Sequence, residues 1–238
     1  MERASLRFFE QEAIEYDTMR NKAFLFKAKA SILSVIVQTK SRRTFLEVGA
    51  GTGEVFKELA NNFQMAIASD ISHNMLVLAR QKLGKHATIA DFVVADAQHL
   101  PFKRRAFDLL ICMDVMEHIE NPSQCINEVL GCISDVGLAA ITTPNPIWAF
   151  ILYIAEKLRL KVREGPHRYI FLTAHTRELS RMTSTEYIGS LVFFPIKTPI
   201  DSLLERTTKV PFVKMLGFSQ LILVKRIVKM QGDGKQQT

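Results

Sequence analysis

Three glycines at alternate positions are the residues of this sequence that say most about chemistry. Gly49, Gly51 and Gly53 follow the apolar segment 45–48, which contains the carboxylate of Glu47. Glycine adopts a positive φ at little cost and leaves no side chain in the way of a ligand, so this spacing predicts a strand that turns closely around a bound molecule before a helix begins. Open α/β sheets bind their ligands at the carboxyl ends of the strands, which is where we expect Glu47 and the glycines.

The residue after Gly53 separates two classes of cofactor that such a turn can bind. A dinucleotide fingerprint, G-x-G-x-x-G, requires a glycine at this position, and the sequence has Glu54 instead. A second acidic group here would repel a pyrophosphate, whereas the carboxylate of Glu47 suits a cofactor with a cationic amino group and a sulfonium. The turn alone is weak evidence, because many glycine turns are plain strand-to-helix connections.

Acidic residues also end the next predicted strands. Asp70 stands where a carboxylate can accept hydrogen bonds from two ribose hydroxyls, although a nicotinamide enzyme would carry such an acid as well. Further along, the acid-plus-small pair Asp96-Ala97 follows a short strand, and a buried apolar strand over 107–113 comes next.

The glycine turn, Asp70, the Asp96-Ala97 step and the strand 107–113 have an order and spacing that resemble class I S-adenosylmethionine-dependent methyltransferases. The resemblance covers about residues 44–145. It implies an enzyme that binds S-adenosyl-L-methionine, with the Asp96-Ala97 step beside the adenine. The resemblance also implies that nine residues bind the cofactor: Glu47, Gly49, Gly51, Gly53, Asp70, Ile71, Asp96, Ala97 and Met113.

Three later motifs narrow the resemblance to a subgroup. D-V-M-E-H-I at 114–119, T-P-N-P at 143–146 and G-P-H at 165–167 are similar to the small-molecule methyltransferases of ubiquinone and menaquinone biosynthesis. This similarity implies methyl transfer to the oxygen or carbon of a small, lipophilic or aromatic acceptor. Enzymes that methylate amino groups of nucleic acids commonly show [N/D]-P-P-[Y/F] after the fourth strand, and the sequence M-D-V-M at 113–116 disfavours such an acceptor.

Two histidines are the candidates for a catalytic base. His118 follows the fourth strand, and an imidazole that titrates near pH 6.5 suits the removal of a proton from a phenol or hydroxyl. It is equally interpreted as a structural histidine at a helix start. His167 lies in a loop that we expect to overhang the pocket. Asp114, Glu117 and His118 together could hold a hard divalent ion, but their spacing is not diagnostic and no metal site is expected.

Strands rich in Val, Ile, Leu and Ala alternate with helical segments, which predicts an α/β fold with a doubly wound, mostly parallel sheet. We expect seven strands, with an antiparallel last strand, near 44–48, 65–70, 91–95, 107–113, 137–142, 187–194 and 218–228. One domain is expected. In it residues 1–43 form an N-terminal helical cover, residues 44–145 the S-adenosylmethionine-binding core, and residues 146–238 the substrate-cover helices and C-terminal strands.

Three segments outside the core are expected to shape the substrate side. Tyr16 could present its ring to the sulfonium with Arg20 on the methionine carboxylate, or phenylalanines such as Phe9 could simply pack this segment down. The apolar run 147–155 predicts a core helix or one lying over an apolar pocket, and it is too short to span a bilayer. The segment 195–216 could shape a hydrophobic pocket, rest on a membrane, or pack on the sheet edge.

Charge is distributed unevenly along the chain. Residues 44–145 contain 7 Lys and Arg against 12 Asp and Glu, so the flanks contain 24 against 12 and carry a net charge of +12 within a total of +7. This pattern suits an anionic substrate or peripheral contact with an anionic membrane surface, and it also fits a plain lysine-rich exterior. The three cysteines lack C-x-x-C spacing and no signal peptide opens the chain, which favours a cytoplasmic location.

Three other functions remain open at this point. An RNA methyltransferase is suggested by the basic flanks, and tight, salt-dependent RNA binding would support it. A non-catalytic protein of the same fold would bind the cofactor without turnover. A nicotinamide oxidoreductase is disfavoured by Glu54.

Overall fold

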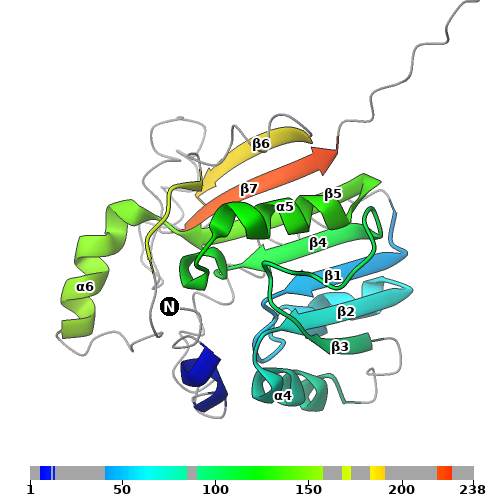
Figure 1. Cartoon of the computed structure of the whole chain (residues 1–238), viewed down its shortest axis with the longest axis horizontal. Helices are drawn as coiled ribbons and strands as arrows, with labels where there is room; N and C mark the ends of the chain where they lie inside the picture. Colours follow the sequence, from blue (N-terminus) through cyan, green and yellow to red (C-terminus); the bar gives the residue numbers. More distant parts are fainter. Residues whose placement is uncertain are drawn as a thin grey trace, which may run out of the picture.

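Seven strands form one mixed sheet in the computed structural model of this chain, in the order β3-β2-β1-β4-β5-β7-β6 (Figure 1). The structure describes residues 6–11, 13, 41–84, 90–157, 168–172, 183–190 and 219–226. The strands are β1 (Thr44–Val48), β2 (Met65–Asp70), β3 (Ala90–Val94), β4 (Phe107–Met113), β5 (Ile133–Pro144), β6 (Thr183–Ser190) and β7 (Ser219–Arg226). Pairing is parallel from β3 to β5, and β7 runs antiparallel to both of its neighbours. The predicted fold class, including the antiparallel last strand, is confirmed.

The strand order reverses between β1 and β4. From β1 the chain adds β2 and then β3 on one side, and it then returns to place β4 on the other side of β1. Ligands of open α/β sheets bind at such a reversal, outside the carboxyl ends of the strands. This topology fixes where the glycine turn and the ends of β2 and β4 must meet.

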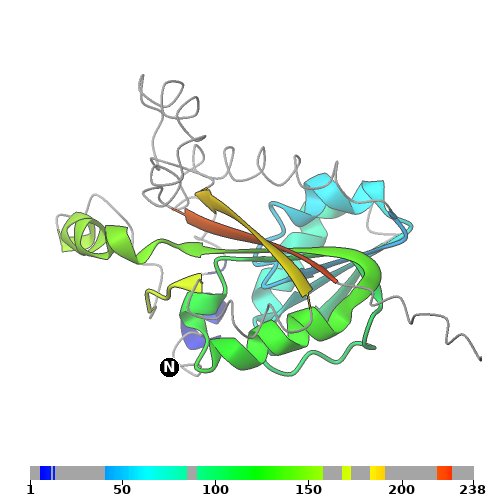
Figure 2. The same ribbon diagram turned by 90° about the horizontal axis from the view of Figure 1, so that it is seen from above.

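Two apolar layers cover the two faces of the sheet. Side chains of successive strand residues point to opposite faces, so Phe45 packs with helix α3 (Phe56–Leu59) and Leu46 packs on the other face with helix α5 (Pro122–Cys132). Every residue of β4 is buried, as expected for a central parallel strand covered on both sides. Figure 2 shows α5 along one side of the sheet.

The longer helices begin and end at residues suited to those positions. Helix α4 (His73–Leu83) begins after Ser72, whose hydroxyl accepts a hydrogen bond from the Met75 N–H, and it ends at Gly84 with φ of 57°. Helix α5 begins after Asn121, whose side-chain oxygen accepts from the Gln124 N–H at 3.2 Å. These caps place both helix N-termini at the carboxyl edge of the sheet.

Strand β5 begins four residues before its predicted start, because no loop separates it from α5. Its first residue, Ile133, already pairs with Phe107, and the register shifts before Leu109 pairs with Leu138. A Cβ on Gly137 would lie 2.7 Å from the Phe107 carbonyl oxygen, so glycine is required where the two strands come back into register. Strand β6 lies four residues before its predicted range of 187–194 at both ends, and the other predicted strands agree with the observed ones to within about two residues.

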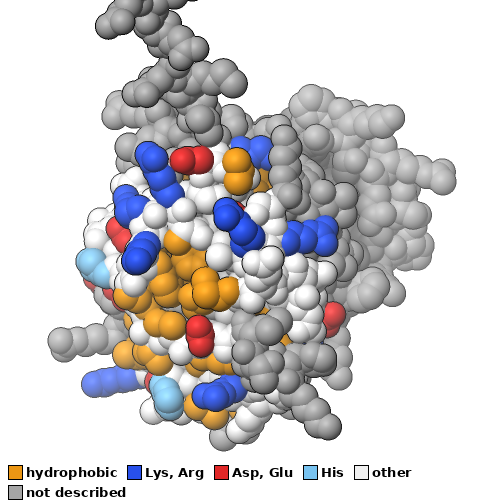
Figure 3. All heavy atoms as spheres, turned by 90° about the vertical axis from the view of Figure 1, so that its right-hand side faces the viewer, with side chains coloured by type: hydrophobic (Ala, Val, Ile, Leu, Met, Phe, Trp, Pro, Cys, Tyr) orange, Lys and Arg blue, Asp and Glu red, His pale blue; other side chains and the backbone are white. Residues whose placement is uncertain are grey.

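Two helical segments lie at the carboxyl edge of the sheet. Figure 1 shows the helical residues 6–11 and helix α6 (Ala149–Lys157) on the side toward which β4 points. The 3₁₀ turn Pro146–Trp148 joins α6 to β5. Within the described ranges, every helix is too short or too polar to cross a bilayer. On the opposite face, at the amino ends of the parallel strands, the residues that the structure describes include Lys and Arg side chains scattered around apolar ones (Figure 3).

Candidate functional site

A pocket opens where the strand order reverses. The glycine turn after β1 forms one wall, the ends of β2 and β3 form another, and the segment after β4 closes the third. Eight of the nine predicted cofactor-binding residues line it: Glu47, Gly49, Gly51, Asp70, Ile71, Asp96, Ala97 and Met113. The spacing of these residues in the sequence therefore converges on one site.

Backbone hydrogen bonds fix the glycine turn to the end of β2. The N–H groups of Gly49 and Ala50 both donate to the carbonyl oxygen of Ser69, at 2.7 and 3.0 Å. Gly49 and Gly51 have positive φ values of 70° and 53°. A Cβ on Gly49 would overlap Val115, whereas a Cβ on Gly51 would find no heavy atom within 4 Å. The open space beside Gly51 is where a ligand can lie directly against the backbone.

Gly53 is the predicted residue that the pocket does not include. Its φ is 76°, and a Cβ there would lie 2.7 Å from the Cβ of Ala79 on α4. Glycine at this position lets the turn pack against the helix rather than against a ligand. Its place therefore favours a structural role over the predicted contact with cofactor.

The carboxylate of Asp70 accepts a hydrogen bond from the glycine turn. One carboxylate oxygen accepts from the Gly51 N–H at 2.8 Å and the other from the Ser72 N–H at 2.9 Å. Burial raises the pKa of Asp70 despite these hydrogen bonds, and Glu10 adds to the rise. A carboxylate oxygen can accept more than one hydrogen bond. Asp70 thus retains the capacity for the two ribose hydroxyls expected from the sequence.

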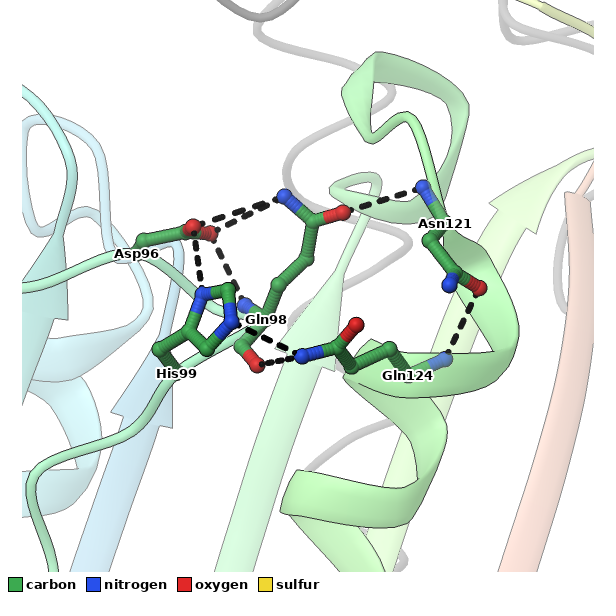
Figure 4. Close-up of polar contacts among 5 residues, drawn as sticks. All are labelled: Asp96, Gln98, His99, Asn121 and Gln124. Atoms are coloured by element: carbon green, nitrogen blue, oxygen red, sulfur yellow. Dashed lines mark hydrogen bonds and ion pairs between the residues drawn. The ribbon is translucent and has the colours of Figure 1, made fainter.

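Asp96 is held by donors from its own loop, as Figure 4 shows. One oxygen accepts from the Gln98 N–H at 2.8 Å, and the other lies 3.1 Å from Nδ1 of His99. Burial alone would raise the pKa of Asp96, but the hydrogen bonds from Gln98 and His99 outweigh it and hold that pKa below its usual value. The pocket therefore contains an ionised carboxylate whose oxygens act as acceptors only.

Glu54 lines the pocket but does not act as the isolated charge expected from the sequence. Its carboxylate pairs with Lys82 at 2.9 Å and with Lys57 at 3.2 Å. These two ammonium groups offset its charge, so the argument that Glu54 repels a pyrophosphate is weaker than the sequence suggests. The buried Glu47, 3% exposed, remains on the pocket wall and complements a cationic ligand group.

The segment after β4 brings His118 to the pocket. Its ring packs edge-on against Phe9, with the ring centroids 5.1 Å apart, and both residues line the cavity. Phe9 comes from the helical residues 6–11, which the Glu10 carboxylate anchors by accepting from the His73 N–H at 2.7 Å. The sequence suggested only a packing role for Phe9, and its place beside His118 on the pocket wall could not be predicted from local sequence.

The acidic residues of this segment accept hydrogen bonds within the protein, and Asp114 also lines the pocket. Asp114, with an unusual positive φ of 51°, accepts a hydrogen bond from Thr142 at 3.1 Å. Glu117 is buried and accepts from Thr143 at 3.1 Å. In the part of the chain that the structure describes, no three His, Cys, Asp or Glu residues are grouped as metal ligands would be. His167, Tyr16, Arg20 and the segment 195–216 lie outside the described residues.

Comparison with known proteins agrees with this geometry. Residues 46–141 match the family of the methyltransferase domain. The malonyl-[acyl-carrier protein] O-methyltransferase of Geobacter sulfurreducens is 31% identical over 136 residues, which are 56% of this chain and 49% of that protein. The ubiquinone biosynthesis O-methyltransferase of Glaesserella parasuis is 26% identical over 135 residues, 52% of this chain and 56% of that protein. The matched region thus spans about half the length of these relatives.

A solved structure shows that the likeness in fold extends further. The N-methyltransferase NodS of Bradyrhizobium japonicum, in complex with S-adenosyl-L-homocysteine, superposes with a TM-score of 0.68. The alignment covers 94% of this chain and all of that chain at 12% identity, which establishes the fold alone. The resemblance to class I methyltransferases that the motifs indicate is confirmed, and S-adenosylmethionine, the cofactor it implies, agrees with these findings.

Proposed function

We propose that this chain, whose residues 46–141 match the methyltransferase domain, binds S-adenosyl-L-methionine in the pocket and methylates a small acceptor. The observation that carries the proposal is the convergence of eight predicted cofactor-binding residues around the open space beside Gly51. When bound, the cofactor supplies an electrophilic methyl group on a sulfonium.

Each group of pocket residues would contact a different part of the cofactor. The glycine turn would accept the cofactor against its backbone, Glu47 would face its cationic groups, and Asp70 would accept from the ribose hydroxyls. Asp96 would lie beside the adenine. These assignments rest on the carboxylates that line the pocket and on the lack of a Cβ at Gly51.

His118 is our candidate for the general base. It lines the pocket, so it could take a proton from a phenol or hydroxyl as the acceptor oxygen attacks. Its contact with Phe9 would orient the ring and shield it from water. Because methyl transfer requires mainly that two groups be aligned, this base matters only when the acceptor loses a proton. His167 stays a second candidate for the same role.

A lipophilic or aromatic acceptor is supported by the surface next to the pocket edge. Helix α6 begins five residues after β5 ends, and Phe150, Ile151 and Tyr153 are more than half exposed on it. The same surface, with Lys157 at its end and the basic flanks of the chain, would suit peripheral contact with an anionic membrane. Such contact would bring a lipophilic acceptor close to the pocket.

Calorimetric titration with S-adenosyl-L-homocysteine, and with NADH as control, tests the cofactor. We expect saturable binding of S-adenosyl-L-homocysteine alone. Binding of NADH alone, or of neither ligand, would overturn the proposal. Phenolic and lipid acceptors are then screened with labelled methyl donor, and an RNA is included in the screen. Cofactor binding without transfer to any acceptor would favour a non-catalytic protein of this fold, and transfer to RNA alone would favour the RNA methyltransferase.

A further inference from the structure

A hydrogen-bonded chain of polar side chains links the pocket carboxylate Asp96 to the start of α5. Its members are Asp96, Gln98, His99, Asn121 and Gln124, and they come from the loop after β3 and from the first turn of α5 (Figure 4). The His99 side chain is 71% exposed. Both of its ring nitrogens nevertheless have partners within the protein.

The geometry determines which nitrogen of His99 carries the proton. The side-chain nitrogen of Gln124 lies 3.0 Å from the Gln98 backbone oxygen, which can only accept, so this amide must present its NH₂ group here. The same NH₂ group lies 2.9 Å from Nε2 of His99. That ring nitrogen must therefore accept, and the proton of the neutral ring is on Nδ1. Nδ1–H then donates to Asp96.

A second amide is fixed in the same way. The Gln98 side-chain oxygen accepts from the Asn121 N–H at 3.0 Å, which turns its NH₂ group toward Asp96 at 3.3 Å. Asp96 thus receives donors from the Gln98 backbone, the Gln98 side chain and His99. The Asn121 N–H orients the Gln98 amide, and the Gln98 backbone oxygen orients the Gln124 amide.

We propose that His99 is a positioning residue for the cofactor, because its Nδ1–H aims the Asp96 carboxylate at the 6-amino group of the purine. The proposal rests on the proposed function, in which Asp96 lies beside the adenine. His99 does not line the pocket, so it acts through Asp96 and touches no ligand. An acceptor-only carboxylate held in one direction favours a purine that has an amino donor over one that lacks it.

The test compares two ligands in four proteins. The ligands are S-adenosyl-L-homocysteine and its analogue whose purine lacks the 6-amino group, and the proteins are the wild type, His99→Leu, His99→Asn and Gln124→Met. The amide nitrogen of asparagine takes the place of Nδ1 and can still donate to Asp96. The ratio of the two dissociation constants is the readout.

We expect the wild type to prefer S-adenosyl-L-homocysteine by about tenfold or more, the effect of one well-placed hydrogen bond. In His99→Leu the preference should fall severalfold, because only the amino-bearing ligand loses affinity, and His99→Asn should restore it. If His99→Leu weakens both ligands by the same factor, or neither, the proposal is overturned. If the wild type binds neither ligand, the proposed function itself fails, which is a different outcome.

Gln124→Met adds a readout that depends on the tautomer. Without the Gln124 donor, the ring proton can move to Nε2 and leave a bare lone pair facing Asp96. The preference of Gln124→Met for S-adenosyl-L-homocysteine should therefore lie between those of the wild type and His99→Leu. A ratio equal to that of the wild type would contradict the role of Gln124 in holding the tautomer.

Discussion

At the scale of single residues, three glycines of one motif have three different surroundings. Gly49 has no room for a side chain because Val115 occupies the space. Gly53 is packed against Ala79, and Gly51 faces open space in the pocket. All three have a positive φ, so the motif is needed for the turn, but only Gly51 leaves the space for a ligand.

Gly51→Val should abolish or greatly weaken the binding of S-adenosyl-L-homocysteine. The valine side chain would occupy the pocket space that is open beside Gly51. A side chain at positive φ also costs about 1–2 kcal/mol of stability. Gly84→Val is the matched control, because Gly84 has a similar φ of 57° and an equally open neighbourhood but lies at the end of α4.

Both variants should lose similar stability in thermal unfolding, and only Gly51→Val should lose affinity in calorimetry. Unchanged affinity in Gly51→Val would show that the ligand does not lie against this turn. An equal loss in both variants would point to general destabilisation instead.

Most of the candidate site could be predicted from sequence because its residues stand at the ends of consecutive strands. Eight of nine predicted residues line the pocket for this reason. Phe9 and His99 could not be placed in this way. Phe9 reaches the pocket from a segment before the first strand, and the role of His99 depends on an amide of α5 that lies 25 residues further along the chain.

At the scale of elements, Gly53→Ala should weaken the packing between the glycine turn and α4. The new methyl group would lie 2.7 Å from the Cβ of Ala79 and would sit at a positive φ of 76°. We expect a loss of about 2–4 kcal/mol in the free energy of unfolding, from the overlap and the backbone strain together. Urea unfolding measures it.

Ala79→Gly in the Gly53→Ala background is the companion of that experiment. Removal of the second methyl group should recover the steric part of the loss and leave the backbone part, although glycine within a helix costs about 1 kcal/mol by itself. A double-mutant cycle isolates the interaction. Strictly additive effects would show that the two positions are not in contact.

A second prediction at this scale concerns Asp108, which joins β4 to its neighbours. Its buried carboxylate accepts from Ser134 at 3.1 Å and from the Arg43 N–H at 3.1 Å, and it also accepts from Ser41. Burial alone would raise the pKa of Asp108, but these hydrogen bonds and Arg43 hold it below 3.8. A depressed folded pKa gives stability that is present above 3.8 and is lost as the pH falls through the folded value.

Asp108→Asn should therefore cost about 2 kcal/mol at pH 7 and should flatten the fall in stability below about pH 4. Urea unfolding at a series of pH values measures both effects. If the free energy of unfolding of the variant fell below pH 4 as steeply as that of the wild type, the Asp108 hydrogen bonds would not contribute to stability in this range.

The order and type of the elements could be predicted because a parallel strand and its covering helix each have a clear apolar pattern. Strand β4 is apolar at nearly every position, and the structure buries all of it. The start of β5 was wrong by four residues, since Ser134, Asp135 and Val136 have no apolar pattern and are ordered by the pairing of Ile133 with Phe107. Long-range pairing of this kind leaves no local signal.

At the scale of the whole molecule, the two ends of the sheet differ. The carboxyl end holds the pocket with its carboxylates, and the helical residues 6–11 and α6 also lie there (Figure 1). The amino end has scattered Lys and Arg side chains among apolar ones (Figure 3). A methyl acceptor must reach the pocket, so we expect it to enter at the carboxyl end.

The exposed apolar surface of α6 leads to the last prediction. Phe150 is 71% exposed and Tyr153 is 57% exposed, with the ammonium of Lys157 5.6 Å from the centre of the Tyr153 ring. Aromatic side chains beside a basic group are typical of helices that lie at the surface of an anionic bilayer. We expect the protein to sediment with phosphatidylcholine vesicles that contain phosphatidylglycerol, and less so with phosphatidylcholine alone or at high salt.

The double variant Phe150→Ser, Tyr153→Ser should reduce the sedimented fraction severalfold, because each substitution removes an aromatic group that would enter the interface. Its matched control is Met65→Ser, Val136→Ser, which removes two side chains that are 41% and 59% exposed at the amino end of the sheet. This control should sediment like the wild type. Equal sedimentation of both variants would contradict the prediction that α6 contacts the membrane. If light scattering without lipid shows self-association that the α6 variant abolishes, the surface instead binds a second copy of the chain.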